Sequence, residues 1–137
     1  MSNTRPANTT SVADRTRPVA TGGPVIAVHF LGDSIAFVLA EEAAILVGAD
    51  GSCQHISLHE GGILASAGDG ARVVTGGDDG KLIETDPAGA TRIVFADPKR
   101  RWIDHVALGG DGATAWSTGK SVQVLKPKGE VKSLELP

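Results

Sequence analysis

The sequence predicts an all-β protein built from antiparallel four-stranded sheets, and three observations carry this prediction. Four short apolar runs recur in units that start at Val25, Ile63 and Ile103, with offsets of 38 and 40 residues. A glycine turn follows the third run of each unit and keeps the same two offsets. No ten-residue helical segment separates the runs, which disfavours parallel strands joined by crossover helices. A fixed period of this length indicates a repeat architecture.

The second and third units divide into four expected strands each. In the second unit these are residues 63–67, 72–75, 81–85 and 91–95. In the third unit they are residues 103–108, 113–117, 121–125 and 131–136. The pairs Asp79-Gly80 and Asp111-Gly112 tolerate the backbone conformations that tight hairpins need. Consecutive strands are therefore expected to pair through short turns.

The first unit contains a segment that fits two structures. Residues 35–47 are rich in Ala, Leu and Glu, which are good helix formers. The register of the other two units instead makes this segment two strands that turn at Glu41-Glu42. We expect the strand arrangement.

The chain is expected to begin with a disordered tail over residues 1–22, since this stretch is rich in Thr, Ser, Arg and Pro. Residues 23–137 are expected to hold the three units, at about 25–60, 61–99 and 100–137.

Composition excludes several functional classes. The net charge of −3 gives no reason to expect a nucleic-acid or membrane partner. No stretch approaches the ~20 apolar residues of a membrane span, and the N-terminus has no secretory signal. The lone Cys53 cannot form an intrachain disulfide, which favours a reducing compartment and a cytoplasmic location.

The stretch from Arg72 to Leu82, RVVTGGDDGKL, resembles the second and third strands of a WD repeat. A weaker version spans residues 115–122. The resemblance, to a divergent WD-repeat β-propeller of bacterial type, implies antiparallel four-stranded blades. It also implies a non-catalytic scaffold that binds a protein partner, with no cofactor. We therefore expect no enzyme activity and no catalytic residues.

The family's hydrogen-bond network within a blade joins a His, a Ser or Thr, an Asp and a Trp. Its Gly-His and Trp-Asp pairs are missing from this sequence, and His59 lies two residues before Gly61-Gly62. The resemblance therefore carries over only Thr75 and one of Asp78 and Asp79, as a structural turn network. The blades are expected to depend more on packing than on this network.

Other candidate sites are weaker. Asp78-Asp79 lacks the alternating acids of a calcium loop, and the glycines around it lead into a strand, whereas a phosphate loop leads into a helix. Cys53 and His55 share a strand face, but no third catalytic residue accompanies them. We therefore expect no metal site, although His29 and His105 leave open a metal in a propeller channel.

Lys99, Arg100, Arg101 and Trp102 form the best candidate for partner binding, because Arg and Trp are enriched at binding hot spots. The ordinary alternative is a solvated charge run with Trp102 packed between blades. If the segment binds a partner, replacing both arginines with alanine is expected to weaken capture and leave the melting temperature nearly unchanged.

Three blades make an incomplete ring, because propellers typically have four to eight. The chain is therefore expected to be part of a larger propeller, or to pair with a second copy and close the ring. Two alternatives to the scaffold stay open. One is a propeller enzyme of the lactonase or quinoprotein type with a metal or cofactor in its channel, and the other is a fragment without independent function.

Overall fold

The computed structural model describes residues 11–135 and residue 137. The first ten residues of the expected disordered tail, residues 1–10, lie outside the described residues. A short 3-10 helix, η1 (Val12–Arg15), precedes an extended segment that leads to the first strand. Val19 of that segment packs against the first sheet. No helix in the described part of the chain is long and apolar enough to cross a membrane.

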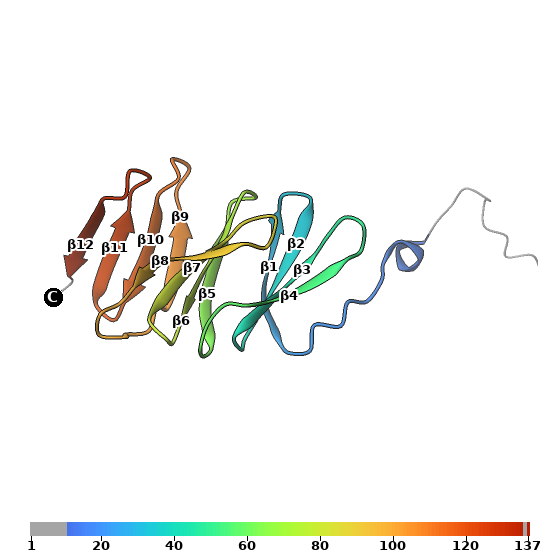
Figure 1. Ribbon diagram of the computed structural model, residues 1–137, viewed down its shortest axis with the longest axis horizontal. Helices are drawn as coiled ribbons and strands as arrows, with labels where there is room; N and C mark the ends of the chain where they lie inside the picture. Colours follow the sequence, from blue (N-terminus) through green and yellow to red (C-terminus); the bar gives the residue numbers. More distant parts are fainter. Residues whose placement is uncertain (1–10, 136) are drawn as a thin grey trace, which may run out of the picture.

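Twelve strands form three four-stranded antiparallel sheets, each in sequence order, and the all-β prediction is confirmed (Figure 1). The first sheet holds β1 (Val25–Leu31), β2 (Ser34–Leu39), β3 (Ala43–Val47) and β4 (Cys53–Ser57). The second holds β5 (Ile63–Gly68), β6 (Val73–Gly77), β7 (Lys81–Thr85) and β8 (Thr91–Ala96). The third holds β9 (His105–Leu108), β10 (Thr114–Thr118), β11 (Ser121–Leu125) and β12 (Val131–Glu135).

The ambiguous segment forms strands, as its register indicated. Ile35 of β2 pairs with Val47 of β3, and Val38 pairs with Ala44 across the same hairpin. β3 is buried along its whole length. A strand that is covered on both faces loses the alternation of polar and apolar residues, and for this reason its composition resembles that of a buried helix.

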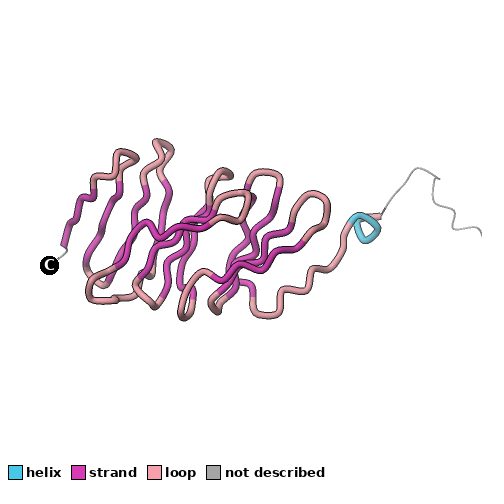
Figure 2. Tube along the Cα trace, viewed as in Figure 1, coloured by secondary structure: helices cyan, strands magenta, loops and turns pink. Residues whose placement is uncertain are grey.

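The three sheets stand side by side, and the core lies between them (Figure 2). We call the side of each sheet that faces the preceding sheet its front face, and the side that faces the next sheet its back face. Between the first two sheets, Ala36 and Val38 on the first back face lie in one cluster with Val73 and Ile83 on the second front face. Each sheet thus buries its apolar side chains against its neighbour.

The second and third sheets repeat this arrangement with larger side chains. Trp116 of β10 is buried in a cluster with Val74 and Leu82, and its ring centroid lies 4.8 Å from that of Phe95. Gly76 leaves room for Ile103, whose Cγ2 would lie only 2.5 Å from a side chain added at the glycine. A large side chain on the front face of one sheet therefore packs against a small residue on the back face of the preceding sheet.

Candidate functional site

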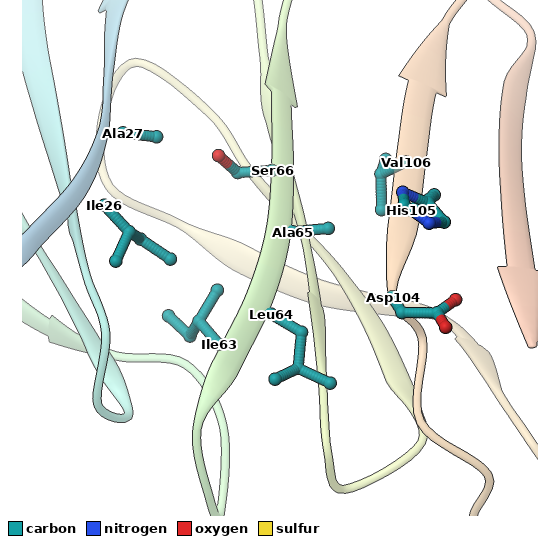
Figure 3. A pocket seen from close by; sticks show the side chains of 9 residues that line it. All are labelled: Ile26, Ala27, Ile63, Leu64, Ala65, Ser66, Asp104, His105 and Val106. Atoms are coloured by element: carbon teal, nitrogen blue, oxygen red, sulfur yellow. The ribbon is translucent and has the colours of Figure 1, made fainter.

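The first strands of the three sheets, β1, β5 and β9, lie next to one another and line an open groove of about 550 Å³ (Figure 3). Most of its walls are apolar, and its polar side chains are those of Ser66, Asp104 and His105. A groove with apolar walls and a few polar groups is the usual form of a small-molecule site. This groove is the best candidate site in the described residues.

A hydrogen bond joins His29 of β1 to Ser66 of β5, with Nε2 and Oγ 2.8 Å apart. His29 packs closely against Gly68, where a larger residue would push its ring away. Burial lowers the pKa of His29, because an apolar environment disfavours the charged imidazolium. His29 is therefore neutral at pH 7 and can accept a proton through Nε2, while Ser66 faces the groove.

Two polar side chains of the third sheet complete the groove. Asp104 precedes β9, and its Oδ1 accepts a hydrogen bond from Oγ of Ser117 at 2.8 Å. His105 follows it and is exposed. The three groups do not converge, because the Ser66 hydroxyl is directed to the β1 side, whereas Asp104 and His105 lie on the far side of β9 (Figure 3). Sequence reasoning singled out His29 and His105 but missed Ser66 and Asp104, which carry no local motif.

The other sequence-based candidates do not form sites. Among residues 11–135 and 137, no three His, Cys, Asp or Glu side chains come together as a metal site would require. Cys53 and His55 are exposed on β4, and the Cys53 thiol donates a hydrogen bond to the carbonyl oxygen of Gly51, 3.8 Å away. His29, which could have shared a channel metal with His105, forms a hydrogen bond with Ser66 instead.

The turn network of the second sheet is more complete than the sequence indicated. His59, between β4 and β5, joins Asp79 through Nδ1 at 3.0 Å and Thr75 through Nε2 at 2.9 Å. Asp79 is thus the acid of the pair that takes part, while the side chain of Asp78 lies against Gly61. Thr75 and one acid take part, as the resemblance implied, and His59 supplies the histidine that the sequence comparison did not carry over.

The electrostatics of Asp79 follow from these contacts. Burial raises the pKa of Asp79, but hydrogen bonds from His59 and from the backbone amides of Glu60 and Lys81 outweigh that effect and hold the pKa below its usual range. The carboxylate is therefore ionised and fully bonded. Its role is to connect the loop before β5 to the β6–β7 turn.

The segment from Lys99 to Trp102 lies in the connection between β8 and β9 and divides into two parts. Arg101 donates two hydrogen bonds to the buried carboxylate of Asp97, whereas Arg100 forms an exposed ion pair with Glu60. Trp102 is 63% exposed, so it is not packed between the sheets. Partner binding by these four residues stays a prediction.

The structural role of Arg101 changes one expectation. Because the Arg101 side chain donates hydrogen bonds to Asp97, replacing Arg100 and Arg101 with alanine should lower the melting temperature. The sequence alone predicts a nearly unchanged melting temperature. Arg101 is thus a poor probe of partner binding, and Lys99, Arg100 and Trp102 remain the exposed part of the segment.

The sequence matches no protein-family model and no curated protein, so membership of the WD-repeat family is not shown. Solved structures do match. A virginiamycin B lyase from Staphylococcus aureus, a catalytically inactive histidine-to-alanine variant with quinupristin, has a TM-score of 0.67 at 12% identity. The match covers 86% of this chain and 43% of that one.

Two further structures agree. A streptogramin B lyase has a TM-score of 0.64 at 10% identity, over 83% of this chain and 42% of that one. The selenomethionine form of the Staphylococcus aureus enzyme has a TM-score of 0.61 at 15% identity, over 80% and 40%. The chain therefore spans less than half the length of these neighbours.

These neighbours correct the expectation that the chain is not an enzyme. Every one of the three is named as a lyase, so the fold is one that enzymes use, and the fold gives no ground for excluding catalysis. At 10 to 15% identity the likeness shows the fold alone. The chain has a β-propeller-type fold with three four-stranded antiparallel blades.

Proposed function

We propose that this chain supplies three blades of a propeller enzyme whose reaction centre faces the groove of β1, β5 and β9. The observation that carries the proposal is the 2.8 Å contact between His29, which has a lowered pKa, and Ser66 at the wall of the groove. The lyase names of the fold neighbours support it by analogy.

The pair is suited to proton transfer. Ser66 contacts the groove, and the neutral imidazole behind it can take up a proton as the hydroxyl receives one from a bound molecule. A lyase eliminates a group: a proton leaves the substrate, the bond to the leaving group breaks as a double bond forms, and the proton passes to the leaving group. His29 would hold that proton between the two steps.

The pH dependence follows from the sign of the shift. His29 must be neutral to accept a proton, and its pKa is lowered from the usual value of about 6.5. Activity should therefore rise with pH through the lowered pKa, with its midpoint below pH ~6.5. A titration of the imidazole by NMR should give the same midpoint.

Quinupristin, which one neighbour contains, is the first compound to test. Its conversion would be followed by liquid chromatography and mass spectrometry. We expect His29→Gln and Ser66→Ala to lower the rate by about 10²- to 10⁴-fold, the usual contribution of general acid–base catalysis.

His55→Gln is the matched control, because His55 is exposed on the outer strand β4, and it should leave the rate unchanged. Equal loss in this variant, or no conversion by the unaltered protein, would contradict the proposal.

A further inference from the structure

Two apolar sheet faces of this chain have no sheet against them in the described residues. One is the front face of the first sheet, where Phe30 pairs with Ile35 and Val28 pairs with Phe37 across the β1–β2 hairpin. The other is the back face of the third sheet, where Ala115 pairs with Ala107 and with Val124. Directly paired residues point to the same side of a sheet, so each set shares one face.

Equivalent positions in the three repeats show what these faces lack. Ile63 and Ile103, at the starts of the second and third repeats, are 4% and 0% exposed because the preceding sheet covers them. Val25, at the start of the first repeat, is 42% exposed, and Phe30 on the same face is 76% exposed. The β1 part of this front face thus carries the apolar side chains of a covered face without the cover.

The back face of the third sheet shows the same lack. Leu82 of β7 is fully buried against the third sheet, whereas Val122 at the equivalent place in β11 is half-buried. A shallow apolar hollow of about 180 Å³ lies there, lined by His105, Val106, Ala107, Ala115, Trp116, Ser117 and Val122.

The two open faces are complementary halves of the interface that the chain already forms twice. Within the chain, the large Trp116 lies on a front face, and the small Gly76 lies on the back face that precedes it. The open front face likewise carries Phe30 and Phe37, and the open back face carries Ala107 and Ala115. A single sequence therefore offers both partners of one more interface.

Charge favours the same pairing. Residues 25–60 hold five acids and neither Lys nor Arg, whereas residues 100–137 hold six Lys or Arg against four acids. The first repeat is therefore acidic and the third is basic, so a contact between them in two different chains is attractive, while first-to-first contacts are repulsive.

From these observations we infer that two copies of this chain associate head to tail twice, each placing its first front face on the other's third back face. The pair would form a closed ring of six blades, within the usual range for propellers. Each copy matches 40 to 43% of a neighbouring lyase chain, so two copies supply most of that length. This inference does not depend on the proposed catalytic pair.

Val19 of the segment before β1 packs on the β2–β3 part of the first front face. The β1 part, with Val25, Val28 and Phe30, is open. The contact surface offered to the second copy is therefore the β1 part of the face.

Light scattering coupled to size-exclusion chromatography tests the inference on the full chain. We expect twice the chain mass of 14.0 kDa. Phe30→Asp and Ala107→Asp each put a charge into both contacts of the pair, and each variant should run as a monomer. Both residues are exposed in the single chain, so circular dichroism should show unchanged folding.

Mixing the two variants distinguishes this front-to-back arrangement from one in which two identical faces meet. Each variant keeps the face that the other lacks, so an equimolar mixture should regain pairs through the one intact contact. Ile93→Asp is the control: Ile93 is exposed on β8, away from both faces, and this variant should stay paired. A monomeric unaltered protein, an assembly larger than a pair, or a mixture that stays monomeric would overturn the inference.

Discussion

Replacing Asp79 with alanine is expected to lower the free energy of unfolding by about 2 to 3 kcal/mol, because it leaves a buried hydrogen-bond donor without its carboxylate acceptor. The side chains of His59 and Asp79 are 0% and 2% exposed. The carboxylate accepts hydrogen bonds from the buried His59 ring and from the part-buried amides of Glu60 and Lys81, so removing it leaves the imidazole without its partner inside the sheet. Urea unfolding measures the loss.

Asp78→Ala is the matched control, since the two acids are adjacent in the same turn. Asp78 is half-buried and its side chain is outside the His59–Thr75 network, so its loss should cost no more than about 0.5 kcal/mol, as at other surface positions. If both variants lost the same free energy, the network would not be what stabilises the second sheet.

Acid should weaken the same network. The pKa of Asp79 is lower in the folded chain than the value of about 3.9 in an unfolded chain. Stability from this group is therefore fully present above that value and is lost as the pH falls through the folded pKa. The difference in unfolding free energy between the unaltered protein and Asp79→Ala should accordingly shrink below pH ~4.

The strands could be predicted from the sequence because their signals are local. Short apolar runs, tight glycine turns and a constant offset each occupy a few neighbouring residues, and together they placed the β6–β7 hairpin correctly, with Thr75 opposite Ile83. Residues 35–47 have the composition of a helix, but the strand positions of the other two units predicted correctly that they form two strands.

The sites could not be predicted in the same way, because their residues are far apart in the sequence. Ser66 meets His29 from a different sheet, 37 residues away. His59 lies in a loop and reaches Asp79 over 20 residues, at a spacing that the resemblance did not cover. Such contacts depend on how the sheets stack, which no local pattern encodes.

Asp97→Ala is expected to cost about 2 kcal/mol, because several donors of the connection between the second and third sheets lose a buried acceptor. Its side chain is fully buried and accepts hydrogen bonds from the amides of Lys99 and Arg101 and from the Arg101 guanidinium. The Arg101 guanidinium and these amides hold the pKa of Asp97 below its usual range. Removing the carboxylate leaves all of these donors without their acceptor.

The two arginines of the segment supply the comparison that isolates this effect. Arg101→Ala should destabilise the protein more than Arg100→Ala does, although solvent screens its 38% exposed side chain. Arg100→Ala should cost at most about 1 kcal/mol, because Arg100 and Glu60 form an exposed pair. In a double-mutant cycle, Asp97→Ala and Arg101→Ala should be non-additive, since each removes the same contact. Additive losses would mean that Asp97 stabilises the connection through the backbone amides alone.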